Sequence, residues 1–258
     1  MRWPILLVLG CLFGSGCISV VGQAAGPAAP ALHEALLWDD LYPTLVVEVG
    51  AVPGRAPDPS ALVAFGLAIV ELTGRAEPDV RLLEPVAIPA QGGGYGPADL
   101  ARIHHATARV VDPDVHAVGS TATVHVLFLD GAMRAGESDR LTLGSTLWGE
   151  GLIAVFPDAY ASATRLAGPD RTVPARAEMD RHVLLHELGH AFGLVGQRIP
   201  MVRPHVDAEH PGHSSNPVSI MHHRPPMTLD GVVYADQPRD FDADDRADLA
   251  AFRATAPR

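Results

Sequence analysis

The chain has 258 residues, of which 47% are hydrophobic, so it can bury the core of one domain or at most two. Its formal net charge of -11 argues against nucleic acid as a partner, because phosphate backbones are bound by basic faces. Eight of the 13 histidines lie between His182 and His223. This concentration is the first indication of a metal site.

The N-terminus is typical of an export signal. A short basic region at Met1-Arg2 and an apolar run over residues 5–13 precede the small residues 14–16 and Cys17. Small residues before a cysteine resemble a bacterial lipobox, which implies cleavage before Cys17 and lipidation of its thiol. Cys11 also fits such a motif, but the apolar run before it is short. A plain signal peptide or an uncleaved anchor is the alternative.

Three regions follow from this reading. Residues 1–17 are expected to be the signal peptide, residues 18–40 a Gly/Ala/Pro-rich tether, and residues 41–258 the folded domain. The protein is then exported to the cell envelope, where the lipid attaches it to a membrane. The residue after Cys17 is Ile18 rather than Asp, which favours the outer membrane by analogy with bacterial lipoproteins; secretion remains open.

From about Leu41 the pattern alternates between strands and helices, as in an α/β or α+β domain. Strands are expected, in chain order, at Thr44–Val49, Val80–Ile88, Thr121–Leu129, Leu141–Trp148 and Leu152–Phe156. Helices are expected at Ser60–Leu72, Pro97–Val110, Pro174–Leu194 and Ala243–Arg253. Residues 92–96 are a glycine-rich loop, and residues 198–240, rich in Pro, His and Asp, show little periodicity.

The helix expected at residues 174–194 contains His186-Glu187-Leu188-Gly189-His190. His186 and His190 are four residues apart, so their rings project from one face and can share a tetrahedral zinc ion. Glu187 lies beside the metal and can take a proton from water and return it to a leaving amine. His182 is one turn further back, and we expect it to be a neighbour and not a ligand.

A catalytic zinc site needs a third protein ligand and keeps its fourth position for water. His205, Glu209 and His210 are the nearest downstream candidates by spacing. A ligand supplied from a second helix is disfavoured in this stretch, because prolines flank it at positions 204 and 211.

Residues 186–193 resemble the first eight residues of the metzincin signature, in which the glycine lets the chain turn out of the helix. In that family the third histidine follows three residues after this glycine, and Gly196 occupies that position here. Residues 213–221 resemble the segment that joins a histidine ligand to the Met-turn in archaemetzincin-like peptidases. Ser214 and Ser219 stand where those relatives have cysteine.

The resemblance implies His213 as the third ligand, with His205 as the alternative, and Met221 as an apolar floor beneath the metal. It also implies a metzincin-like α+β domain. Such a domain has a mixed sheet with an antiparallel edge strand, a long active-site helix, and an irregular C-terminal part that ends in a helix. The edge strand would lie near residues 143–148, where an extended peptide could add to the sheet.

The function expected from these residues is that of a zinc-dependent endopeptidase acting on peptide or protein substrates, with Glu187 as general base and then acid. Two alternatives stay open. One is a non-catalytic surface lipoprotein that binds zinc, and the other is a zinc hydrolase of non-peptide substrates. Glu187 favours an enzyme, because a structural zinc site has no use for a carboxylate beside the first histidine.

Overall fold

The computed structural model describes residues 31–110, 121–134, 142–160, 175–223 and 240–256. Its centre is a mixed sheet with the strand order β2-β1-β5-β8-β7, in which β3 also pairs with β1. These strands are β1 (Thr44–Ala51), β2 (Val80–Leu82), β3 (Val86–Ala87), β5 (Thr121–Phe128), β7 (Gly144–Leu147) and β8 (Leu152–Val155). Every pair is parallel except β7 with β8. The mixed sheet with an antiparallel edge strand is therefore confirmed.

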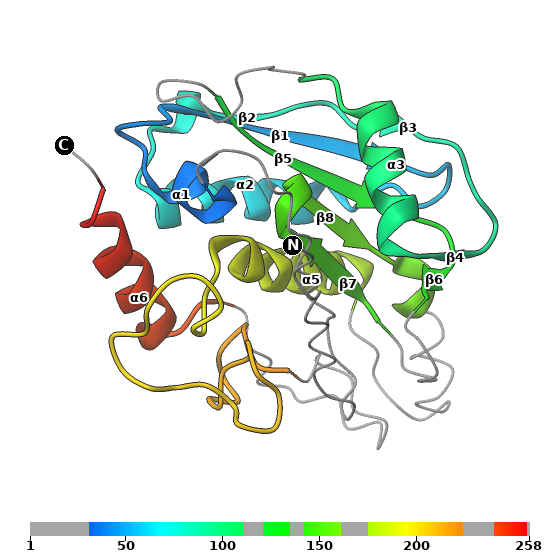
Figure 1. The fold of residues 1–258 in the computed structure, drawn as a ribbon. Coiled ribbons are helices and arrows are strands. Elements are labelled where there is room, and N and C mark those ends of the chain that lie inside the picture. The colour runs from blue at the N-terminus through cyan, green and yellow to red at the C-terminus, as the bar shows by residue number, and fades with distance from the viewer. Residues whose placement is uncertain (1–30, 111–120, 135–141, 161–174, 224–239, 257–258) are drawn as a thin grey trace, which may run out of the picture.

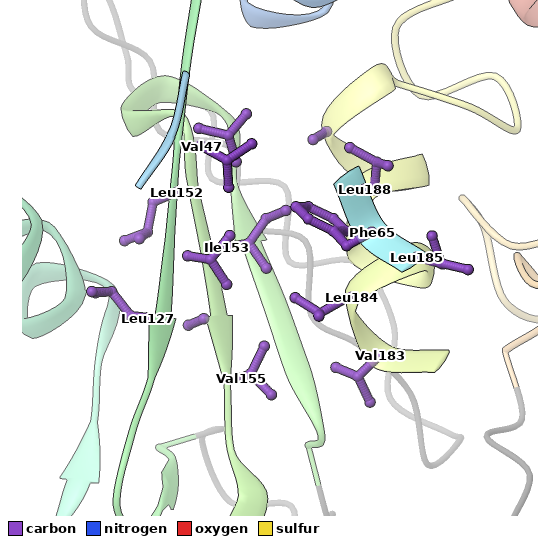
Figure 2. Close-up of a cluster of buried hydrophobic side chains, with 14 of the residues drawn as sticks. Val47, Phe65, Leu127, Leu152, Ile153, Val155, Val183, Leu184, Leu185 and Leu188 are labelled. Atoms are coloured by element: carbon purple, nitrogen blue, oxygen red, sulfur yellow. The ribbon is translucent and has the colours of Figure 1, made fainter. Parts of the chain in front are cut away.

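Helices cover both faces of this sheet (Figure 1). They are α1 (Leu32–Leu37), α2 (Pro59–Thr73), α3 (Pro97–Thr107) and α5 (Arg176–Phe192). A further helix, α6 (Ala243–Arg253), packs against α1 and α2 instead. In Figure 2, Ile153 and Val155 point from β8 toward α5, whereas Leu152 points to the opposite face. Phe65 of α2 lies between the sheet and α5 and is fully buried. This apolar layer fixes α5 against the sheet, since each buried side chain of this size contributes about 1.5–3 kcal/mol.

The limits of the helices follow from local signals. Asp58 caps α2 by accepting a hydrogen bond from the backbone N–H of Ser60, and Pro59 occupies its first turn. Gly193 ends α5 with φ of 76°, in the left-handed region where glycine carries no Cβ penalty. The expected helices at residues 60–72, 174–194 and 243–253 are thus confirmed. The second of these, α5, is shorter than expected and ends at Phe192.

The strand expected over residues 80–88 is divided into β2 and β3, which pair with successive parts of β1. Pro85 lies between them, and proline supplies no N–H to a sheet. Two other expectations differ from the structure. Residues 94–95 of the glycine-rich loop form β4 (Gly94–Tyr95), which pairs with β6 (Ala132–Met133). The strand expected to reach Trp148 ends at Leu147, where a 3₁₀ turn begins.

Helix α1 lies in the range assigned to the tether, yet its Leu36 and Leu37 are fully buried. Arg75 holds it in place. The Arg75 guanidinium donates hydrogen bonds to the carbonyl oxygens of Ala35 and Leu36 at the end of α1, and to that of Tyr42. Unpaired carbonyls at a helix C-terminus attract such a cation.

The chain between α5 and α6 has no regular helix or strand among the residues described, 193–223 and 240–242. Isolated bridges join Val206 to Ser214 and Ser214 to His222, so three passes of the chain run side by side. Figure 1 shows α5 between the sheet and this irregular part. The irregular C-terminal part ending in a helix is confirmed for the described ranges. Among all the residues that the structure describes, no helix is long and apolar enough to cross a membrane.

Candidate metal centre

The ligand face of α5 points away from the sheet. His186 and His190 are buried, and their Nε2 atoms lie 3.1 Å apart. In a tetrahedral zinc site with Zn–N distances of 2.0–2.1 Å, two ligand nitrogens are about 3.3 Å apart. The pair of imidazoles therefore has the spacing that one zinc ion requires.

Carbonyl oxygens determine which nitrogen of each ring carries the proton. His186 Nδ1 lies 2.7 Å from the backbone oxygen of Ile220, and His190 Nδ1 lies 2.9 Å from the side-chain oxygen of Gln197. These oxygens only accept, so both Nδ1 atoms donate and both Nε2 atoms present lone pairs to each other. Two facing lone pairs repel unless a cation lies between them, and outer hydrogen bonds of this kind orient metal-binding histidines.

The third imidazole comes from the irregular part of the chain. The ring centroid of His213 lies 5.3 Å from that of His186 and 5.0 Å from that of His190. The ligand atoms offered by the three rings lie within 4.8 Å of one another. Both ring nitrogens of His213 are buried without a hydrogen-bond partner among the described residues. Such an orphaned ring in a buried polar cluster fits a metal ligand.

The three histidines are held in the neutral form that binds metal. Burial is the main cause, and it lowers the pKa of His186 well below its usual value. Burial and the nearby His213 lower the pKa of His190 to about 3. Burial also lowers the pKa of His213 to about 4. At neutral pH the cluster therefore offers lone pairs and no protons at its centre.

Met221 packs directly against the ligand helix. It is fully buried, and a Cβ built at Gly189 would lie only 2.1 Å from its Sδ. Gly189 therefore makes room for the methionine one residue before His190. The preceding residue, Ile220, supplies the carbonyl that orients His186. The backbone N–H of Ser214 donates to the carbonyl of Met221, which ties this turn to the segment that carries His213.

Glu187 is fully buried and is held by the edge strand. The hydroxyl of Thr146 in β7 lies 2.7 Å from Glu187 Oε2 and 2.9 Å from the Glu187 carbonyl oxygen. A Cβ at Gly144, also in β7, would lie 2.8 Å from Glu187 Oε1, so only glycine leaves space for this carboxylate. The edge strand thus determines where the carboxylate beside the first histidine lies.

Two further side chains lie against the end of α5. Trp148, just after β7, donates a hydrogen bond from Nε1 to the carbonyl oxygen of His190. The guanidinium of Arg198 lies 5.2 Å from the centre of the Trp148 ring, within cation–π range. The last turn of α5 is therefore tied to the edge strand by a hydrogen bond from outside the helix.

The other histidine candidate for third ligand lies elsewhere. His205 is buried against α6, with Nε2 3.5 Å from Asp245 Oδ1 and 3.7 Å from Asp248 Oδ2. Its Nδ1 lies 2.9 Å from the carbonyl oxygen of Arg203. The structure therefore brings His213, and not His205, to the pair on α5.

The remaining histidine and carboxylate candidates also lie outside the cluster of three. Glu209 is exposed, and His210 lies beside Asp207. The ring of His182 stacks on that of His186 with a centroid distance of 6.2 Å, as a neighbour on the same helix face. Cys17 belongs to residues 1–30, outside the part of the chain that the structure describes.

Residue 196 is a glycine and offers no imidazole to the cluster. Its φ of 70° lies in the left-handed region, and the preceding Val195 also has a positive φ of 54°. For a β-branched residue this conformation is rare and strained. The chain turns back on itself after α5, so the next histidine to reach the cluster comes from residue 213.

Sequence reasoning missed Thr146, Gly144 and Gln197 as residues of this site. The first two lie in the strand that was expected to be the edge strand, and nothing local marks them as neighbours of Glu187. Gln197 follows the glycine turn at Gly196, and its Oε1 lies 2.9 Å from His190 Nδ1. The one local signal for Gln197 is that it is a polar residue directly after the glycine turn.

No protein-family model matches the sequence, and no characterised protein gives a significant match. The geometry of this site and the motif that it contains are therefore what indicate a function.

Proposed function

We propose that this chain is a zinc-dependent endopeptidase that uses His186, His190 and His213 as metal ligands and Glu187 as general base and acid. The observation that carries the proposal is the convergence of these three buried imidazoles, 3.1 Å apart at the Nε2 atoms of the helical pair. The resemblance of residues 186–193 and 213–221 to metzincin segments supports a peptidase over other zinc hydrolases.

Zinc bound at such a site supplies Lewis acidity, which lowers the pKa of a coordinated water and polarises a carbonyl. Residues of this chain perform the remaining tasks. Glu187, held at Oε2 by Thr146, takes a proton at its carboxylate and returns it to the amine of the leaving product. The backbone carbonyl of Ile220 and the side-chain carbonyl of Gln197 keep the lone pairs of His186 and His190 turned inward.

The edge strand is the proposed place for an extended substrate. β7 is the last strand of the described sheet and is antiparallel to β8. A peptide that pairs with β7 adds a strand to the sheet through its backbone, whatever its side chains are. Because Gly144 and Thr146 of this strand contact Glu187, a peptide on β7 would pass close to the proposed base. We therefore propose peptides and unfolded protein segments as the substrate class.

The N-terminal segment adds a proposed location. Residues 1–17 have the pattern of an export signal ending in a cysteine, and lipidation of Cys17 would attach the enzyme to a membrane of the cell envelope, or secretion would release it. This part of the proposal rests on the sequence, because these residues lie outside those described.

Hydrolysis of a broad peptide library and zinc content, measured together on the full chain, test the function. We expect wild type to bind zinc at this site and cleave peptides. Glu187→Gln should keep its zinc and lose roughly 100-fold or more in kcat, which is the usual contribution of general acid–base catalysis. His213→Ala should lose the zinc ion of this site and the cleavage.

His205→Gln is the matched control, because His205 is also buried but faces Asp245 and Asp248. It should keep its zinc and its activity, with circular dichroism showing that every variant is folded. A folded wild type that holds zinc but cleaves no peptide would contradict the endopeptidase. Zinc retained in His213→Ala and lost in His205→Gln would reverse the assignment of the third ligand.

A further inference from the structure

A second group of metal-binding side chains lies beside the candidate zinc centre. It consists of Asp207, His210 and His223, whose ligand atoms lie within 4.8 Å of one another. Nδ1 of His210 is 2.9 Å and Nδ1 of His223 is 3.0 Å from the same oxygen, Oδ2 of Asp207. Two imidazole nitrogens and one carboxylate oxygen thus converge at a single point.

The two rings are aligned for this convergence. His210 and His223 stack with a centroid distance of 3.5 Å and an interplanar angle of 8°. The other carboxylate oxygen, Oδ1 of Asp207, accepts a hydrogen bond of 2.9 Å from the backbone N–H of Glu209. That bond orients the carboxylate so that Oδ2 faces the imidazoles, in the way that outer hydrogen bonds orient metal ligands.

Exposure of these side chains is compatible with entry of an ion. The side chains of Asp207 and His210 are each 18% exposed, and that of His223 is 9% exposed. The group is sheltered enough for strong electrostatic attraction and open enough for exchange with solvent.

The backbone that builds this group also presents His213. The N–H of His210 donates to the carbonyl of Asp207, and the N–H of His213 donates to the carbonyl of His210, at 3.2 and 3.1 Å. Asp207 in turn donates its N–H to the carbonyl of His213 at 2.7 Å. The bridge between Ser214 and His222 brings the segment of His223 alongside. Fixing the side chains of this group would therefore fix the position of His213.

The loop of residues 193–223 needs an interaction that holds it in place. Loops longer than about 12–15 residues without regular structure are uncommon unless they are functional or held in place. Residues 193–223 contain no helix or strand, only isolated bridges. The chain has cysteine only at positions 11 and 17, so no disulfide can close this loop.

We propose that Asp207, His210 and His223 bind a second divalent metal ion that holds the loop carrying His213. Two imidazoles with one carboxylate are a donor set for zinc and similar transition metals, whereas calcium and magnesium prefer oxygen ligands throughout. The second ion has its own ligands. The rings of His213 and His223 are 6.5 Å apart and nearly perpendicular, so two separate sites lie side by side. This inference does not depend on the proposed peptidase activity.

The test is the number of zinc ions bound by the full chain, measured by elemental analysis after chelation, addition of Zn²⁺ and removal of free metal. Wild type should bind two equivalents, and His210→Ala and Asp207→Asn should each bind one. Asp207→Asn is the sharper variant, because its amide oxygen still accepts a hydrogen bond but is a far weaker metal ligand. His222→Ala, a change beside His223 that removes none of the three ligands, should bind two.

The double variant His186→Ala/His190→Ala separates this proposal from the peptidase. It should keep one equivalent, and that equivalent should be lost when His210→Ala is added. Zinc should also raise the Tm of the double variant, and this rise should disappear with Asp207→Asn. The proposal is overturned if wild type binds a single equivalent that Asp207→Asn retains, which would leave Asp207 as a shared hydrogen-bond acceptor. If wild type binds a single equivalent of zinc that His186→Ala/His190→Ala keeps and Asp207→Asn loses, the site at Asp207 is supported and the proposed zinc site at His186 and His190 is contradicted.

Discussion

The chemistry of the centre depends on single hydrogen-bond acceptors outside it. Ile220 and Gln197 accept from the Nδ1 atoms of His186 and His190, so the lone pairs needed for metal point at each other across 3.1 Å. A donor in place of either acceptor would reverse the tautomer and direct a proton into the metal position. Two carbonyl groups outside the ligand set, one from the backbone and one from a side chain, thus decide whether the site can hold a metal.

Thr146 has the same role for Glu187. Replacing Thr146 with Val removes the hydroxyl that lies 2.7 Å from Oε2 but keeps the shape of the side chain. A hydrogen bond to a charged group contributes about 1.5–3 kcal/mol, so we expect kcat to fall roughly 10- to 100-fold while zinc content stays at the wild-type level. Steady-state peptide hydrolysis and elemental analysis measure the two effects.

Thr146→Ser provides the control, because it restores the hydroxyl and loses only a methyl group. Its kcat should return close to that of wild type. Equal activity of Thr146→Val and wild type would mean that this hydrogen bond does not position the carboxylate.

Among the elements, α5 carries the most constraints, because it is packed on both sides. Its apolar residues face the sheet and α2, as Figure 2 shows for Leu184 and Leu188. Its opposite face carries the ligands and rests on the Met221 turn. Where α5 touches the Met221 turn, only glycine fits at position 189 without a shift of its neighbours, since a Cβ there would lie 2.1 Å from Met221 Sδ and 2.9 Å from Phe241.

We therefore expect Gly189→Ala to lower the free energy of unfolding by about 1–3 kcal/mol, the usual cost of overpacking a core. Met221 is fully buried, so its thioether must displace neighbouring atoms to make room for the added methyl group. Urea unfolding of the metal-free protein measures the change directly.

Gly66→Ala in α2 is a matched control, since a Cβ there meets nothing within 4 Å. This substitution should raise stability by about 0.5–1 kcal/mol, because alanine loses less backbone entropy in a helix than glycine. If both substitutions stabilise the protein to the same extent, Met221 is not packed against α5 as described.

At the scale of the whole molecule, buried neutral histidines make the fold sensitive to acid. Burial and the neighbouring His104 lower the pKa of His125 to about 4, and burial and Arg198 lower that of His33 to about 4. The unfolded chain protonates such residues near pH 6.5. Between these values the unfolded state binds more protons than the folded state, so stability falls as the pH decreases.

His125→Gln should remove part of this dependence. Since one pKa unit corresponds to about 1.4 kcal/mol, the change from 6.5 to about 4 represents roughly 3 kcal/mol. Wild type should therefore lose up to about that much more stability than the variant between pH 7 and pH 4. Urea unfolding with a chelator present measures both proteins at each pH, so the other histidines cancel in the difference. Parallel pH profiles would show that His125 is not held neutral by the fold.

Local patterns predicted much of this molecule. The apolar runs at residues 44–49 and 121–129 became adjacent parallel strands, and the long helix carries His186 and His190 on one face. These features depend on contacts within a few residues, which periodicity and capping signals report directly. Where the sequence carried a conflicting local signal, as at Pro85, the strand broke there.

The sequence by itself determined the helix, its ligand pair and the carboxylate beside them, because positions four apart on a helix share a face whatever surrounds it. Only the tertiary structure decided which distant residues complete the site. His213 approaches and His205 turns to α6 because hydrogen bonds between separate chain passes set their positions. Thr146, Gly144 and Gln197 enter the site through contacts that no local pattern records, since the free energy of such contacts depends on how the whole chain closes around α5.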